Sequence, residues 1–128
     1  MPFRVETGGG RLRGLAEGVD SRHLRALERG EREVEAELDL HGLRAAEARQ
    51  AVRQALHEAH EEGMRCIRVI HGRGRGSELG PVLREALPDW LTAPPAGRLV
   101  MAFASAPGPL GGEGATLVLL RRRRAPRA

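Results

Sequence analysis

The feature that most constrains this chain is a direct succession of strand-like, helix-like and strand-like patterns. In residues 38–41 two leucines alternate with Asp39 and His41, as in a strand with one buried face. Residues 45–59 repeat alanine, valine and leucine at steps of three and four, which predicts an amphipathic helix. Residues 64–70 are nearly continuously apolar, as in a strand covered on both faces. The sequence therefore predicts a right-handed parallel strand–helix–strand unit.

A second helix and two further strands follow this unit. Residues 82–91 repeat apolar side chains at helical spacing, and Pro88 is expected to kink this helix or end it early. Residues 99–104 and 115–120 read as apolar strands, and the loop between them has no helical pattern, so an antiparallel hairpin is expected. The predicted fold class is α/β, a two-layer sandwich in βαβαββ order with a four-stranded mixed sheet.

Residues 1–37 differ from the rest because they hold few apolar residues, many charges and a run of three glycines. We expect a flexible N-terminal arm there, with one short helix near residues 21–29. The expected organisation is this arm (1–37), a folded domain over residues 38–121 and a basic C-terminal tail over residues 122–128.

The net charge of the chain is +4 at pH 7, and every basic residue is arginine. Five of the 21 arginines lie in the last eight residues, so the body of the chain is close to neutral. The basic composition therefore describes the tail and does not by itself establish a nucleic-acid-binding domain.

Cysteine content and hydropathy indicate where in the cell the protein is expected. The single cysteine, Cys66, cannot form an internal disulfide framework, which favours a reducing, cytoplasmic location. The apolar stretches are too short to cross a bilayer, so no membrane partner is expected.

Two histidines stand at the ends of the two predicted parallel strands. Ligands bind beyond the carboxyl ends of strands in open α/β sheets, so His41 and His71 are expected at one edge as an acid and base pair. Asp39 shares a strand face with His41 and would orient and stabilise an imidazolium. The alternative is that Asp39 caps a neighbouring turn and that His41 is a structural histidine with satisfied hydrogen bonds.

The segment that begins at His71 reads HGRGRG. Its glycines allow a tight turn with exposed N–H groups, and the start of the next helix adds a positive dipole, so the segment favours an anion such as phosphate. Arg65 and Arg68 add positive charge to the same stretch. The glycine spacing matches neither of the common phosphate-binding patterns, so the loop alone defines no known nucleotide site.

Other candidate motifs are excluded by spacing or composition. The HEAH motif at residues 57–60 places its histidines three apart, whereas a zinc-protease helix needs four, so no metal site is predicted. With one tryptophan, two phenylalanines and no tyrosine, the chain lacks the aromatic residues that a base-stacking surface needs.

Three motifs, LDLHG at 38–42, HGRG at 71–74 and GGEGATLVLL at 111–120, resemble in order and spacing those of the Smr (small MutS-related) domain. The resemblance covers residues 38–121 and is strongest to the stand-alone Smr proteins of proteobacteria. It implies a fold like the C-terminal domain of bacterial translation initiation factor three. It also implies nuclease activity on DNA or RNA, including messenger RNA on stalled ribosomes. The family's catalytic signature falls on Asp39 and His41, and its HGxG motif falls on His71, Gly72 and Gly74.

The leading hypothesis from the sequence is a structure-guided endoribonuclease that requires no metal. His41, aided by Asp39, would deprotonate the attacking 2′-hydroxyl, and His71 or the loop N–H groups would stabilise the phosphate or protonate the leaving oxygen. The alternatives are a DNA-nicking enzyme in which Asp39 ligates Mg²⁺ or Mn²⁺, and a non-catalytic adaptor for RNA or ribosomes. The expected partners are RNA or DNA and the ribosome, and the protein is expected to be a monomer. The expected nucleic-acid contacts are Arg44, Gly72, Arg73, Gly74, Arg75, Gly76, Arg121, Arg122, Arg123 and Arg124.

Overall fold

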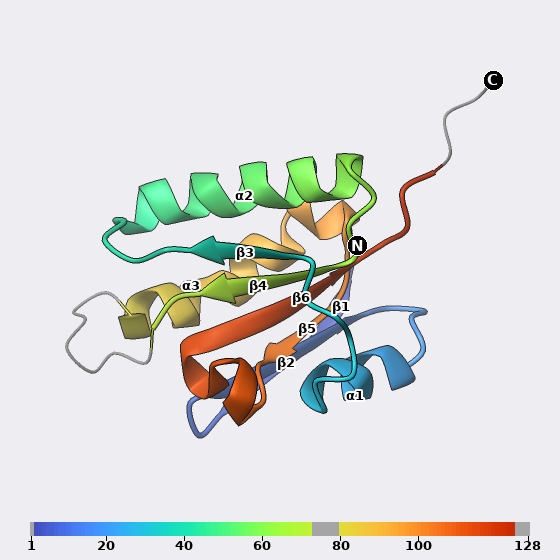
Figure 1. Ribbon diagram of the computed structural model, residues 1–128, viewed down its shortest axis with the longest axis horizontal. Coiled ribbons are helices and arrows are strands. Elements are labelled where there is room, and N and C mark those ends of the chain that lie inside the picture. Colours follow the sequence, from blue (N-terminus) through green and yellow to red (C-terminus); the bar gives the residue numbers. More distant parts are fainter. Residues whose placement is uncertain (1, 73–79, 125–128) are drawn as a thin grey trace.

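The structure of the protein, a computed structural model, describes residues 2–72 and 80–124. Its strands are β1 (Phe3–Gly8), β2 (Arg11–Ala16), β3 (Ala36–Asp39), β4 (Cys66–Ile70), β5 (Val100–Ser105) and β6 (Ala115–Leu120). Its helices are α1 (Arg22–Glu28), α2 (Ala45–Glu61) and α3 (Gly80–Thr92), with short 3-10 turns η1 (Ala96–Arg98), η2 (Gly108–Leu110) and η3 (Gly112–Gly114). The strands form one mixed sheet in the order β1-β2-β5-β6-β4-β3 (Figure 1).

The predicted parallel strand–helix–strand unit is confirmed. β3 and β4 pair in parallel with Leu38 opposite Val69, and α2 connects them. Leu40 prolongs this pairing, because its N–H donates to the carbonyl oxygen of Ile70 at 2.9 Å. The carboxyl ends of the two strands therefore lie side by side. The residues that α2 buries in the core are Ala48, Val52, Leu56 and Ala59.

The predicted antiparallel hairpin of β5 and β6 is also confirmed, and β6 lies between β5 and β4. The helix α3 continues past Pro88 to Thr92, so the proline does not end it early. Leu87 and Leu91, on either side of Pro88, are fully buried in the core. Their packing stabilises the helical backbone through the proline.

The prediction that residues 1–37 form a flexible arm is wrong. β1 and β2 form an antiparallel hairpin whose turn holds Gly9 and Gly10, with φ of 59° and 80° that favour glycine. β2 then pairs antiparallel with β5, and Leu12 donates its N–H to the hydroxyl oxygen of Ser105 at 2.8 Å. The sheet therefore has six strands instead of the predicted four, and two strands and a helix precede the predicted βαβαββ order.

A close contact between Gly14 and Phe103 explains why β2 is hard to recognise. The inward positions of β2 are Leu12, Gly14 and Ala16, and all three are buried. A Cβ atom at Gly14 would overlap the ring of Phe103, which is itself fully buried. The strand thus presents a glycine where an alternating pattern would show an apolar side chain.

The sheet is covered on both faces, so the two-layer prediction is also wrong. α2 and α3 lie on one face, and α1, the short helix near residues 21–29, lies on the other (Figure 1). Leu24 and Leu27 of α1 are buried in a cluster with Ala102 and Ala104 of β5. The small alanine side chains allow α1 to approach the sheet closely.

We predict that Gly14→Ala lowers the free energy of unfolding by about 1–3 kcal/mol, because the added methyl group collides with the buried Phe103 ring. Gly8→Ala is the matched control, since Gly8 lies in β1 of the same hairpin with open space around its Cβ position. Urea unfolding at neutral pH measures both effects. Equal unfolding midpoints for the two variants would contradict the packing of β2 on Phe103.

Candidate functional site

The carboxyl ends of β3 and β4 lie at one end of the sheet, at the left in Figure 1. The β1–β2 turn, the turn before β6 and the starts of α2 and α3 lie at the same end, because the remaining pairs are antiparallel. We term this end, formed by residues 8–11, 39–43, 71–72 and 106–114, the loop edge. Turn amides and helix starts at strand ends form an environment that favours anions.

Asp39 and His41 form a local turn at the end of β3. The Asp39 carboxylate accepts a hydrogen bond from the backbone N–H of His41 at 2.9 Å. The next turn closes when Leu43 donates its N–H to the carbonyl of Leu40 at 3.1 Å, with Gly42 at φ 80°. The His41 side chain remains exposed. Asp39 therefore positions the backbone that carries the imidazole, as in the capping alternative, while His41 is presented to solvent.

His71 has the opposite environment, since its residue is only 5% exposed and both ring nitrogens have partners. Nδ1 lies 3.0 Å from the carbonyl oxygen of Gly72, and Nε2 lies 2.9 Å from the Thr116 hydroxyl. A carbonyl only accepts hydrogen bonds, so Nδ1 carries the proton and the neutral ring accepts at Nε2 from Thr116. Burial lowers the pKa of His71; the hydrogen bond to Gly72 opposes this, and the nearby charge of Arg84 adds to it.

The two histidines therefore do not form the predicted acid and base pair in this structure. They follow neighbouring strand ends, as the register of β3 and β4 requires, but the His71 ring turns inward towards Thr116. Among the described residues, no hydrogen bond joins the two rings. His71 thus serves the loop edge as a buried support.

The turn before β6 fixes the backbone at the end of β4. The carbonyl oxygen of Gly114 accepts hydrogen bonds from the N–H groups of both His71 and Gly72, each at 3.0 Å. This turn needs glycine, because Gly111 and Gly112 have φ of 119° and 55°. The glycines of the GGEG motif thus position the start of the HGRG motif.

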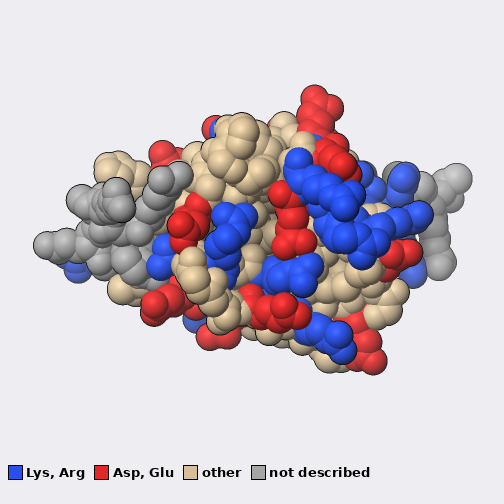
Figure 2. Space-filling view, turned by 90° about the horizontal axis from the view of Figure 1, so that it is seen from below, with Lys and Arg blue, Asp and Glu red and all other residues tan. Residues whose placement is uncertain are grey.

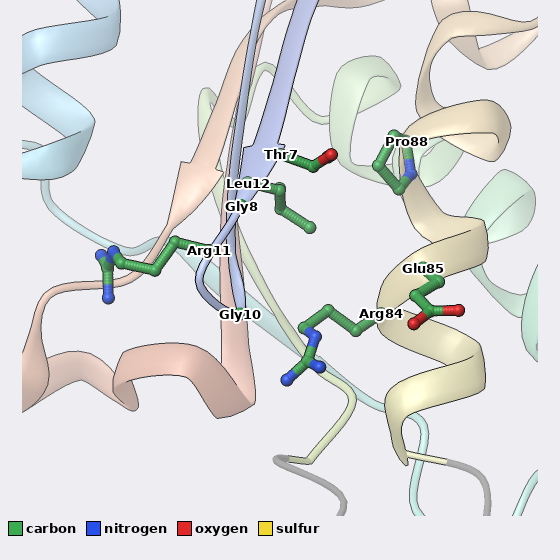
Figure 3. A pocket seen from close by; sticks show the side chains of 8 residues that line it. All are labelled: Thr7, Gly8, Gly10, Arg11, Leu12, Arg84, Glu85 and Pro88. Carbon is green, nitrogen blue, oxygen red and sulfur yellow. The ribbon is translucent and has the colours of Figure 1, made fainter.

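A cavity of about 390 Å³ opens at the loop edge between the β1–β2 hairpin and α3 (Figure 3). Thr7 and Leu12 line it from the hairpin, and Arg84 and Glu85 line it from α3. The half-buried Arg84 makes no hydrogen bond or ion pair within the described part of the chain, and its charge acts on His71. Arg11 points away from α3 and donates to the carbonyl oxygens of residues 105 and 106.

Arg84 is a candidate that sequence reasoning missed. The sequence could have indicated Arg84 by its position near the start of the helix that follows the HGRGRG segment, and the structure brings its charge close to His71. No sequence pattern indicated the cavity, because one of its walls is the β1–β2 hairpin, which was not predicted.

Two arginines that the sequence placed around His71 are instead structural. Arg68 forms an ion pair with Glu37 and donates to the carbonyl of Leu110 at 3.3 Å. Arg65 precedes β4 and therefore lies at the opposite end of the sheet, where its Nε donates to the carbonyl of Leu120 at 2.8 Å. The expected basic patch at the loop edge thus lacks both residues.

The structure separates the other predicted nucleic-acid contacts. Arg44 is exposed at the start of α2 beside the His41 turn, and Gly72 lies at the loop edge with φ 85°. Arg121, Arg122, Arg123 and Arg124 follow β6 at the opposite end of the sheet. The remaining predicted contacts, Arg73, Gly74, Arg75 and Gly76, lie outside the described residues. The last four residues of the basic tail, 125–128, also lie outside them.

The described residues contain no group of three or more histidine, cysteine or acidic side chains placed to hold a metal ion. Cys66 is fully buried, and burial raises the pKa of its thiol to about 11, so it is neutral at pH 7. Within the same residues, no helix has both the length and the apolar composition needed to cross a bilayer.

The fold and its loop edge define a mixed α/β domain with an exposed Asp-x-His turn beside a buried histidine that begins the HGRG motif. Residues 38–121 match the Smr domain, and the chain belongs to the Smr domain family. The resemblance drawn from the sequence motifs is thereby confirmed.

Curated relatives include proteins named ribosome rescue factor SmrB. The one from Shewanella oneidensis is 38% identical over 111 residues, and one from Shewanella baltica is 37% identical over the same length. Each match covers 87% of this chain and 58% of the relative, so the chain spans little more than half of their length.

Two solved structures are similar to this fold. YdaL, a stand-alone small MutS-related protein from Escherichia coli, matches with a TM-score of 0.73 and 28% identity, covering 91% of this chain and 93% of YdaL. The Smr domain of Thermus thermophilus MutS2 matches with a TM-score of 0.57 and 42% identity, covering 67% of this chain and 98% of that domain. The match to YdaL extends beyond residues 38–121 into the N-terminal elements.

We predict that the protein loses stability as the pH falls below the ordinary histidine pKa of about 6.5, because the unfolded chain then binds a proton that buried His71 does not. The contribution of neutral His71 to the free energy of unfolding is complete above that pH. It is lost as the pH falls from about 6.5 to the lowered pKa of His71, by no more than about 1.4 kcal/mol per pH unit. Urea midpoints measured from about pH 8 to about pH 5 should fall for the wild type and flatten for His71→Gln.

His57→Gln, on the exposed side of α2, is the control and should keep the wild-type pH profile. A parallel fall in the wild type and His71→Gln would assign the pH dependence to another group.

Proposed function

We propose that this protein is an Smr-type endonuclease that cleaves structured RNA in the cytoplasm, in association with ribosomes. The observation that carries the proposal is the exposed His41 imidazole, held at the loop edge by the turn that Asp39 closes. Membership of the Smr family and the relatives named ribosome rescue factor SmrB support the substrate class and the ribosomal setting.

His41 acts as the general base. Its free ring nitrogen takes the proton of the RNA 2′-hydroxyl, and the 2′ oxygen attacks the adjacent phosphorus. The bond from phosphorus to the 5′ oxygen breaks, which leaves a 2′,3′-cyclic phosphate and a 5′ oxygen that takes a proton from water. Asp39 is a positioning residue, since its carboxylate holds the His41 backbone.

Phosphates that flank the scissile bond are received beside the cavity between the β1–β2 hairpin and α3, which lies towards the sheet edge opposite His41. Arg84 supplies a guanidinium that no described residue neutralises, and the starts of α2 and α3 add positive dipole. His71 is a positioning residue in this mechanism, because its neutral ring is committed to Thr116 and Gly72.

Recognition relies on backbone shape. Phe103 is fully buried, and Phe3 and Trp90 are partly buried against the core, so the three aromatic residues do not form a shared surface of exposed rings for base stacking. An enzyme built in this way follows the path of the sugar-phosphate chain and has little sequence preference.

His41→Gln is expected to slow cleavage of a labelled RNA hairpin by at least about a hundredfold with binding unchanged, because an amide cannot accept the proton. Asp39→Asn should cost only about tenfold, since its amide oxygen still accepts from the His41 N–H. Gel analysis of the products should show 2′,3′-cyclic phosphate ends, and a chelator should leave the rate unchanged. His57→Gln is the matched histidine control.

Two outcomes of this experiment favour the alternatives. Activity that a chelator abolishes and that Mg²⁺ or Mn²⁺ restores on DNA would favour a DNA-nicking enzyme with Asp39 as a ligand. Equal RNA binding by the wild type and both variants, with no cleavage by any of them, would favour a non-catalytic adaptor.

Arg84→Gln is expected to raise KM for RNA by about threefold to tenfold with a smaller change in kcat, because one phosphate contact is lost. Arg53→Gln, an exposed arginine of α2, is the control with the same change in charge. Steady-state kinetics at low salt distinguishes the two variants. An unchanged KM for Arg84→Gln would remove this residue from the RNA site.

A further inference from the structure

The end of the sheet opposite the loop edge gathers arginines from separate segments of the chain. Arg65 is joined to the end of β6 by two hydrogen bonds: Leu120 donates its N–H to the Arg65 carbonyl at 2.7 Å, and Arg65 Nε donates to the Leu120 carbonyl at 2.8 Å. Arg121 then donates its N–H to the carbonyl of Leu99 at 2.7 Å. Leu99 directly follows Arg98, which is exposed. The first residues of the basic tail are therefore anchored to the domain.

Arg32 joins the same group from the loop after α1. Glu35 donates its N–H to the carbonyl of Cys66 at 2.8 Å, which places this loop beside the start of β4. Burial lowers the pKa of Arg65, the charges of Arg32 and Arg122 lower it further, and the charge of Glu35 opposes them. Arg65 is thus within electrostatic range of Arg32 and Arg122.

Acids lie among these arginines: Glu31 and Glu33 flank Arg32 in the same loop, and Glu61 and Glu62 end α2 at this end of the sheet. The Glu35 carboxylate accepts hydrogen bonds from the backbone N–H groups of Arg65 and Cys66, at 2.9 and 3.4 Å. Glu61 and Arg123 approach only to 3.5 Å with both side chains largely in solvent, a pair worth little. In Figure 2 basic side chains are interspersed with acidic ones over the middle and right of the view.

We propose that Arg32, Arg98 and Arg122 to Arg124, supported by Arg65, form a distal arginine surface that binds the phosphate backbone of the same RNA, away from the scissile bond. This inference rests on the proposed function for the identity of the nucleic acid. Guanidinium groups bind phosphate oxygens in bidentate geometry, and repeated phosphates match several cations along one end better than a single anion does. Bound phosphates also relieve the repulsion among the arginines.

The spacing of the two sites gives the proposal a length requirement. β4 and its flanking residues separate Arg65 from His71, a distance of about 20 Å at the usual rise of a strand. A stem of about four base pairs, roughly 11 Å long at about 2.8 Å per step of an A-form helix, is too short to reach both ends. A stem of about twelve base pairs, roughly 34 Å long, reaches both.

The test measures binding of the full chain to hairpins with these two stem lengths, over a series of salt concentrations. Arg32→Gln/Arg122→Gln should weaken binding of the long stem by about threefold to tenfold and reduce the slope of log affinity against log salt by up to about 1.8. Affinity for the short stem and the cleavage rate at saturating RNA should stay at wild-type values. Arg49→Gln/Arg53→Gln, two exposed arginines on α2, is the control of equal charge.

The distal surface is overturned if the two double variants lose the same affinity, which would indicate net charge alone, or if the long stem binds both as tightly as it binds the wild type. Binding of an acidic peptide is measured in parallel. If Arg32→Gln/Arg122→Gln loses binding to this peptide but keeps full affinity for RNA, the distal arginine surface is overturned in favour of a protein partner. Length-dependent binding without cleavage by the wild type would reject the proposed enzyme and keep the surface. Cleavage by the wild type, with binding that does not depend on stem length, would reject the distal arginine surface and keep the proposed enzyme.

Discussion

Strand β6 is buried along its whole length, and much of the fold follows from the need to cover both of its faces. Val118 and Leu120 belong to the cluster that α2 and α3 cover, while Leu117 and Leu119 belong to the cluster that α1 covers. A strand with apolar side chains on both faces is stable only between two layers. The N-terminal segment therefore completes the domain: α1 covers the second face, and the β1–β2 hairpin pairs with the edge of β5.

The same strand supports the candidate site. The carbonyl of Gly114, immediately before β6, accepts from the backbone of His71 and Gly72, and the hydroxyl of Thr116 bonds the His71 ring. A neutral, buried histidine with both nitrogens bonded is a rigid support, and it fixes the residue from which the glycine loop starts. His41 can then remain exposed, because its own turn is closed locally by Asp39.

The sequence predicted those parts of the fold in which side chains repeat with the period of the backbone. The parallel unit and the β5–β6 hairpin belong to this group, and so does the placement of His41 and His71 at neighbouring strand ends. β2 was missed because Gly14 leaves space for Phe103, so the contact that fixes the strand also removes its apolar signal. The direction of the His71 ring depends on Thr116, 45 residues further along the chain, which no local pattern reveals. Arg65 was placed at the wrong end because closeness in sequence ignores the length of the strand between it and His71.

The pairing of β2 with β5 has a consequence for how the chain reaches this structure. The N–H of Leu12 and the hydroxyl of Ser105 that it meets are 93 residues apart. An isolated two-stranded hairpin is marginal in water, so β1 and β2 gain stability only after β5 has formed. During synthesis β1 and β2 thus emerge before β5 but find their place only after it, and folding of the sheet depends on contacts of long sequence separation.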